Sequence, residues 1–186
     1  MPFPNLPYFV DSDGFKLSES MAIHQYIAEN WNPELAGATI EERGRLDMVR
    51  AVLGDISGKV RPPCYSADTN RQEHGTKCLE LVKPVARFQE STSFLIGDQP
   101  CYADFFWYEL LQAIDMISEG RLRSEQPDLA AYMERMSELP GVADTEAKLT
   151  PLVPFNAKTM SHINNYDPTW TPNAPKVEHM EDQKED

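Results

Sequence analysis

Residues 3–31 read FPNLPYFVDSDGFKLSESMAIHQYIAENW, and this stretch decides the fold of the chain. Tyr8–Val10 is a short apolar run that predicts a β-strand. The DSDG sequence at 11–14 predicts a tight turn with Gly14 at positive φ, so Phe15–Leu17 is expected to form the partner strand. The start of the chain therefore predicts a β-hairpin.

A helix is expected directly after the hairpin, ending near Asn30. Ser18 and Ser20 are both suited to cap its first turn, because a serine hydroxyl can accept a hydrogen bond from a free helical N–H. The apolar positions that we expect to point inward are Met21, Ile23, Ile27 and Ala28.

From Ile40 onward the composition changes to that of long helices. One apolar stripe repeats at intervals of three and four residues, which is typical of a helix with a single buried face; it consists of Leu46, Val49, Leu53, Ile56 and Val60. Further helices are expected over about 70–89, from about 103, from Pro127 to before Pro140, and over about 142–149.

The FPNLPY sequence, the hairpin and the Glu19-Ser20 pair before a helix closely resemble the glutathione transferases, the mu class in particular. The resemblance implies an α+β, mostly α fold: the C-terminal half of a thioredoxin-like domain (1–32), a linker (33–39), an all-helical domain (40–155), and an extended arm with an acidic tail (156–186). Only Met1 and Pro2 precede the match, and a parallel crossover needs a dozen or more residues. We therefore expect the family's N-terminal β-α-β part, with its activating tyrosine, to be absent.

Four residues near the hairpin match glutathione-binding positions of that family. The resemblance implies a cis bond between Leu6 and Pro7, with the Leu6 backbone facing the cysteinyl group of glutathione. It also implies that Glu19 and Ser20 hold the γ-glutamyl end, although the mu pattern has glutamine in place of Glu19. The residues alone leave a plainer alternative, in which Pro7 starts a strand and Glu19-Ser20 is an ordinary acidic helix start.

Two more positions match functional residues within the helical part. Asp55 falls where the mu class places an aspartate that reaches glutathione across the dimer interface; a solvated surface acid is the alternative. Tyr65 matches a tyrosine of the electrophile pocket, but Pro62-Pro63 precede it here and indicate a displaced hydroxyl, so a packed surface tyrosine is the alternative. No catalytic residue is assigned.

The loop before the helix near 103 carries a capping box in this family. Asp104 is expected to accept a hydrogen bond from the backbone N–H of Cys101, where the family has Ser or Thr.

Composition excludes several function classes. The net charge of −13 repels nucleic acid and anionic lipid. No apolar run approaches the ~20 residues of a membrane span, and no secretory signal follows Met1, so we expect an intracellular, by default cytoplasmic, protein without membrane insertion. The three cysteines and four histidines lack metal-ligand spacing, so no metal is expected.

Two functions are consistent with these residues. The first is a glutathione transferase-like protein that has lost catalysis, with glutathione binding kept or lost, and that serves as an interaction or structural subunit. Its partner would be another protein or a second copy, or a larger complex reached through the proline-rich arm that carries Trp170. The alternative is an active, mu-like transferase that conjugates glutathione to electrophiles, with its N-terminal segment missing from this chain.

Overall fold

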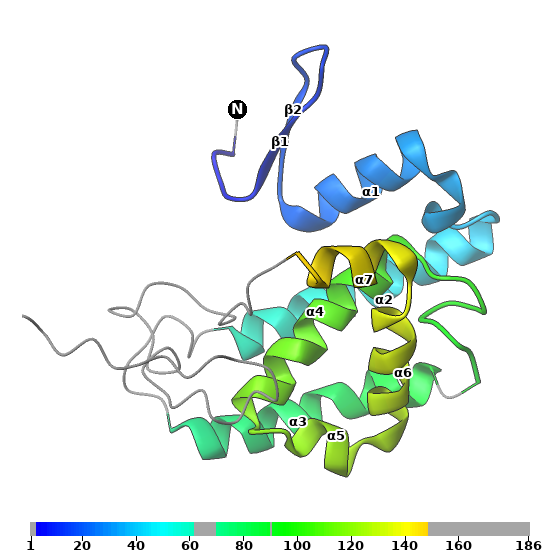
Figure 1. The fold of residues 1–186 in the computed structure, drawn as a ribbon. Helices are drawn as coiled ribbons and strands as arrows, with labels where there is room; N and C mark the ends of the chain where they lie inside the picture. Colours follow the sequence, from blue (N-terminus) through cyan, green and yellow to red (C-terminus); the bar gives the residue numbers. More distant parts are fainter. Residues whose placement is uncertain (1–2, 62–69, 90, 149–186) are drawn as a thin grey trace, which may run out of the picture.

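The computed structural model describes residues 3–61, 70–89 and 91–148. A two-stranded hairpin and the first helix lie side by side above a larger group of packed helices (Figure 1). This mostly helical arrangement with one small sheet confirms the predicted fold class. In chain order the elements are β1 (Tyr8–Val10), β2 (Lys16–Ser18), α1 (Ser20–Trp31), the 3₁₀ helix η1 (Pro33–Ala36), α2 (Ile40–Val60), α3 (Arg71–Gln89), α4 (Tyr102–Ile117), α5 (Arg121–Glu125), α6 (Pro127–Ser137) and α7 (Pro140–Glu146).

The hairpin is antiparallel and closes through a three-residue loop. Asp11 N–H donates to Phe15 O at 2.9 Å, and Gly14 N–H donates to Asp11 O at 2.9 Å. Gly14 has φ of 81°, a conformation that glycine adopts without steric cost, so the predicted turn is confirmed. The second strand begins at Lys16, one residue later than expected.

The start of α1 differs from the prediction. Neither serine caps the helix: Glu19 occupies the N-cap position with φ of 73° and gives no side-chain cap hydrogen bond. Ser18 is engaged elsewhere, since its hydroxyl donates to Phe3 O at 2.6 Å. Ile27, expected to point inward, is 40% exposed, because the buried side of α1 is narrow and contains only Ile23 and Ala28.

Four aromatic rings join the hairpin to α1. Tyr26 stacks on Phe15 with ring centroids 5.0 Å apart, and Phe9 lies 5.7 Å from Tyr26 and 6.1 Å from Trp31. The Tyr26 hydroxyl donates to Asp11 Oδ2 at 2.7 Å. This bond lowers the pKa of Asp11 and raises that of Tyr26. The cluster gives the short hairpin the support that an isolated two-stranded sheet lacks in water.

Helix α2 carries the predicted stripe, because Leu46, Val49, Leu53, Ile56 and Val60 are all buried. A capping box begins it, in which Glu42 N–H donates to Thr39 Oγ1 at 3.1 Å and Thr39 N–H donates to Glu42 Oε2 at 3.2 Å. The expected linker contains η1, which the sequence analysis did not predict; Pro33 at its first position favours this turn.

The remaining helices pack around α4, whose buried residues include Phe106, Trp107, Leu110 and Ile114. Helix α3 approaches the end of α4 closely: a Cβ added at Gly75 would lie 3.0 Å from Ser118 Cα. Two elements differ from expectation. The short α5 was not predicted, and α7 begins at Pro140 and ends at Glu146, earlier than the expected 142–149.

Asp104 is fully buried and links three parts of the helical layer. Its carboxylate accepts from Leu95 N–H at 2.9 Å, from Cys101 N–H at 2.8 Å and from the Tyr132 hydroxyl at 2.8 Å. The predicted bond from Cys101 is thus confirmed. Burial raises the pKa of Asp104, and the hydrogen bonds from these donors oppose that shift.

His24 lies where α1 packs on α4. Its Nδ1 is buried and has no hydrogen-bond partner in the part of the chain that the structure describes. Burial lowers the pKa of His24, and the negative charge of Glu109 on α4 partly opposes this. Burial thus favours the neutral imidazole where α1 meets α4.

We predict that Asp104→Ala lowers the free energy of unfolding by roughly 3 kcal/mol, because it leaves several buried donors without an acceptor. Tyr132→Phe removes one donor and keeps the carboxylate, so it should cost about 1 kcal/mol. Urea unfolding of both variants tests the order. Equal costs for the two would contradict a central role for the carboxylate.

We also predict that acid weakens the fold through His24. The unfolded chain takes up a proton near the ordinary histidine pKa of 6.5, whereas the folded chain does so only at lower pH. The stability that neutral His24 contributes is thus complete above the pKa of the unfolded chain, and it is lost as the pH falls through the pKa of the folded chain. Between about pH 7.5 and about pH 5.5, the melting temperature of His24→Gln should fall less than that of the unmodified chain. Parallel curves would contradict the assignment.

Candidate functional site

The two ends of the predicted glutathione site are joined by Asn5. Its Nδ2 donates to Glu19 Oε1 at 3.0 Å, and its Oδ1 accepts from Leu6 N–H at 2.9 Å. The Leu6–Pro7 bond is cis, as the sequence analysis predicted. The structure therefore brings Leu6, Pro7 and Glu19 together at the start of α1. We call these three residues, together with Asn5 and Ser20, the cradle.

Among the described residues, no side-chain cap engages the first backbone donors of α1 at the cradle. The first N–H groups of any helix lack an intrahelical acceptor, and here Glu19 supplies no side-chain acceptor for them. Ser20, the first helical residue, is only partly buried. Free N–H groups, a hydroxyl and the positive end of the helix dipole together favour a carboxylate ligand.

Asn5 was missed by the sequence analysis, although it lies inside the FPNLPY sequence. Its amide provides both a donor and an acceptor, which is why one side chain can hold the Leu6 backbone and the Glu19 carboxylate together. The signal in the sequence that could have pointed to Asn5 is its place as a polar residue directly before the Leu6-Pro7 pair.

The other predicted site residues are not joined to the cradle. Asp55 is exposed on α2, and no described contact connects it to Glu19 or Ser20. Tyr65 lies outside the described residues, as do Trp170 and the rest of the arm and tail (156–186). Their roles stay predictions.

The end of α2 carries a cation that the sequence analysis also missed. The guanidinium of Arg61 lies 3.4 Å from Glu109 Oε1 and 5.9 Å from the centre of the Phe106 ring, and its Nε donates to Ser57 Oγ at 2.8 Å. Arg61 is thus held against α4 just before the segment that contains Tyr65.

The thiols that the structure describes are poor nucleophiles. Cys78 and Cys101 are buried in the helical core. Burial raises the pKa of Cys78 to about 12 and raises that of Cys101 as well, so both remain protonated at neutral pH.

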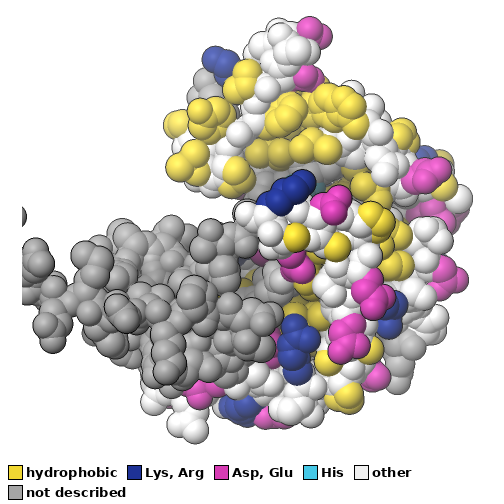
Figure 2. All heavy atoms as spheres, viewed as in Figure 1, with side chains coloured by type: hydrophobic (Ala, Val, Ile, Leu, Met, Phe, Trp, Pro, Cys, Tyr) yellow, Lys and Arg dark blue, Asp and Glu magenta, His cyan; other side chains and the backbone are white. Residues whose placement is uncertain are grey.

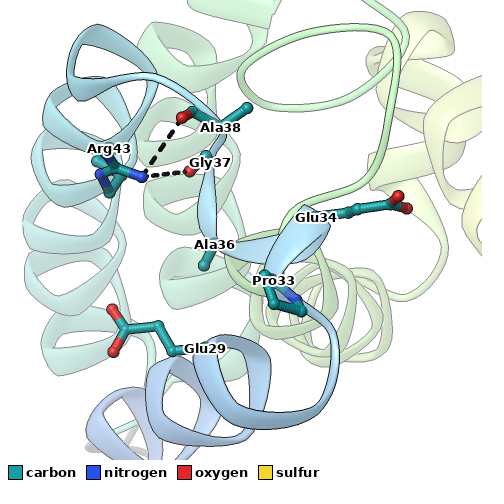
Figure 3. A pocket seen from close by; sticks show the side chains of 7 residues that line it. All are labelled: Glu29, Pro33, Glu34, Ala36, Gly37, Ala38 and Arg43. Carbon is teal, nitrogen blue, oxygen red and sulfur yellow. Dashed lines mark hydrogen bonds between the residues drawn. The ribbon is translucent and has the colours of Figure 1, made fainter.

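A separate open pocket of about 540 Å³ lies at the other end of α1 (Figure 3). Arg43 lines it and donates to Gly37 O at 2.9 Å and to Ala38 O at 3.5 Å. These bonds hold α2 against the segment after η1, so the Arg43 guanidinium has a structural role. The lining residues are Glu29, Pro33, Glu34, Ala36, Gly37, Ala38 and Arg43.

Over the described ranges, no group of three or more His, Cys, Asp or Glu side chains could hold a metal ion. In the same ranges, no helix is long and apolar enough to cross a membrane.

Comparison with known proteins gives matches to both parts of the chain. Residues 1–29 match the glutathione S-transferase N-terminal domain, and residues 55–146 match the glutathione S-transferase C-terminal domain. The chain is 30% identical over 169 residues to a glutathione S-transferase of Dermatophagoides pteronyssinus, covering 89% of this chain and 74% of that protein. It is also 30% identical over 141 residues to glutathione S-transferase Mu 4 of Mus musculus, but that match spans only 63% of the mouse protein.

Solved structures show the same fold. The glutathione S-transferase Blo t 8 superposes with a TM-score of 0.64 and 26% identity, covering 78% of this chain and 69% of that one. A glutathione S-transferase from Pichia kudriavzevii gives a TM-score of 0.62 and 29% identity, covering 75% of this chain and 72% of that one. With both family domains matched and the fold shared, the chain belongs to the glutathione S-transferase family.

Proposed function

We propose that this chain binds glutathione without conjugating it and acts as a subunit that associates with itself or with another protein. The observation that carries the proposal is the cradle, in which Asn5 holds the cis Leu6–Pro7 backbone against Glu19 at the open start of α1. Family membership supplies the ligand, since the relatives are named glutathione S-transferases.

The cradle suits the charges of glutathione. A γ-glutamyl carboxylate would accept from the Ser20 hydroxyl and from the free first-turn amides of α1. The neighbouring ammonium would lie next to the Glu19 carboxylate, one oxygen of which already accepts from Asn5. The Leu6 N–H is bonded to the Asn5 side chain. Of the two Leu6 backbone groups, the carbonyl would therefore be the one that pairs with glutathione, by accepting from the cysteinyl N–H.

Loss of catalysis is supported in part by two hydroxyl groups of the hairpin and α1, those of Ser18 and Tyr26. A thiol with a pKa near 8.5 is only a few per cent ionised at neutral pH, so a transferase needs a hydroxyl that stabilises the thiolate. Ser18 donates to Phe3 O and Tyr26 donates to Asp11, so both hydroxyls are engaged. The second candidate is an active, mu-like transferase that conjugates glutathione to electrophiles with a hydroxyl outside the described residues, either Tyr65 or one beyond residues 1–186.

Self-association is supported by the outer side of α2. Three large apolar residues are exposed along it, namely Ile40 at 78%, Met48 at 50% and Val52 at 40%. Met48 and Val52 are four residues apart and so lie on one face of the helix. We propose that this face forms a homodimer interface, with Asp55 on the same helix.

The purified chain should bind glutathione and show no enzymatic conjugation. Titration calorimetry should give saturable binding, and Ser20→Ala should weaken it about tenfold by removing a hydrogen bond to a charged group. Ser12→Ala, in the hairpin turn, is the matched control and should bind normally. With an aryl halide electrophile, the rate should equal the uncatalysed rate.

Two results would reject this function. Absence of binding by the folded chain would remove the cradle as a glutathione site. Turnover comparable to that of ordinary transferases would favour the active enzyme, and its loss in Tyr65→Phe would identify the hydroxyl responsible.

We predict that Val52→Glu shifts the chain from dimer to monomer in sedimentation velocity, because a charge placed on an apolar interface is costly to bury. Ile27→Glu is the matched control: Ile27 is also 40% exposed but lies on α1. It should leave the sedimentation coefficient unchanged. A shift with Ile27→Glu and none with Val52→Glu would place the interface on the hairpin side instead.

A further inference from the structure

The pocket at the C-terminal end of α1 contains two opposite charges that are not paired with each other. Its volume of about 540 Å³ is within the range of small-molecule sites, about 300–1,000 Å³. Arg43 of α2 and Glu29 of α1 both line it, yet no ion pair joins them in the described ranges. Figure 3 shows these two side chains on the same side of η1, whereas the Glu34 side chain points away from both.

The Arg43 guanidinium is fixed in place but has donors to spare. Its Nη1 donates to Gly37 O at 2.9 Å and to Ala38 O at 3.5 Å. A guanidinium carries five N–H donors in a planar fork, and Nε and Nη2 have no acceptor among the residues that the structure describes. Gly37 permits the close approach, since an added Cβ there would lie 3.1 Å from Arg43 N. The unused edge of the fork suits a carboxylate, which can accept two parallel hydrogen bonds.

The Glu29 carboxylate is oriented by its own helix. Its Oε1 accepts from Gln25 Nε2 at 2.9 Å, one turn earlier in α1. In the described part of the chain, its Oε2 accepts from no donor. A carboxylate with one oxygen held and the other available suits an ammonium group, which forms strong charge-assisted hydrogen bonds.

A ligand with a single charge fits this pocket less well. An anion would approach Glu29 and a chain of net charge −13, and Figure 2 shows acidic side chains gathered on the side of the molecule where α1 ends. A cation would pair with Glu29 but would also lie near the charge of Arg43. A molecule with opposite charges at its two ends pairs with both groups. Pro33, Ala36 and Ala38 give its middle an apolar wall.

We propose that this pocket binds a short zwitterion of the ω-amino acid or dipeptide class, with its carboxylate on Arg43 and its ammonium beside Glu29. The cradle lies at the opposite end of α1, a helix of 12 residues that is about 18 Å long. The site is therefore separate from the cradle, and the inference goes beyond the proposed function.

The test is a titration of the full chain with glycylglycine, followed through the backbone amide signals of Gly37 and Ala38 in NMR spectra. Saturable shifts are expected at millimolar concentrations, because Arg43 and Glu29 are both exposed to water. Two probes each lack one charge: N-acetylglycylglycine has no ammonium, and glycylglycinamide has no carboxylate. Each should bind about threefold more weakly than glycylglycine.

Two variants separate the two contacts. Glu29→Gln should bind glycylglycine about threefold more weakly and should no longer prefer it to N-acetylglycylglycine. Arg43→Lys keeps a cation for the two carbonyls but lacks the planar fork, so it should lose most of the preference for glycylglycine over glycylglycinamide. Glu41→Gln is the matched control: it removes an exposed carboxylate from the first turn of α2, outside the pocket lining, and should bind like the unmodified chain.

Glutathione binding at the cradle should be unchanged in Glu29→Gln, so a failure of this proposal is distinguishable from a failure of the proposed function. Four results would overturn the proposal. The first is no saturable shift of the Gly37 and Ala38 amides, and the second is equal binding of the three probes. The third is equal affinity of Glu29→Gln and Glu41→Gln for glycylglycine. The fourth is a set of shifts confined to the cradle, which would make the cradle the zwitterion site.

Discussion

The buried carboxylate of Asp104 is the constraint on which the rest of the structure depends. A carboxylate without water around it is stable only when donors surround it, and here they come from the loop before α4, from the start of α4 and from α6. These bonds fix α4 relative to its neighbours. Helix α1 packs on α4, and the cradle lies at the start of α1, so the position of the candidate site depends on this one side chain.

Much of the fold could be predicted because local rules and burial agree. The stripe of α2 repeats with helical period and is buried as expected. Gly14 adopts the positive φ that its turn requires, and Asp104 accepts from Cys101 as the spacing of a capping box implies. The cis Leu6–Pro7 bond was anticipated only through the family resemblance, since the residues alone allowed an ordinary strand start.

The misses are places where tertiary contacts override local preference. Serine is a preferred cap, yet Ser18 is engaged by the Phe3 carbonyl and Glu19 takes the N-cap position. Ile27 fits an apolar stripe by spacing but lies outside the buried face of α1, with 40% of it exposed. Asn5 escaped notice because its role depends on a contact with Glu19, fourteen residues away in the chain. Sequence spacing does not encode such contacts.

Glu19 has a thermodynamic consequence for any ligand of this chain. A side-chain-bearing residue at φ of 73° and ψ of 113° is strained, at a cost on the order of 1 kcal/mol that glycine would not have. The fold is therefore less stable than it would be with glycine at this position, and the Glu19 carboxylate is already held by the Asn5 side chain. A ligand that contacts this carboxylate would therefore not have to order it. Less of the free energy of that contact would then be offset by lost conformational entropy.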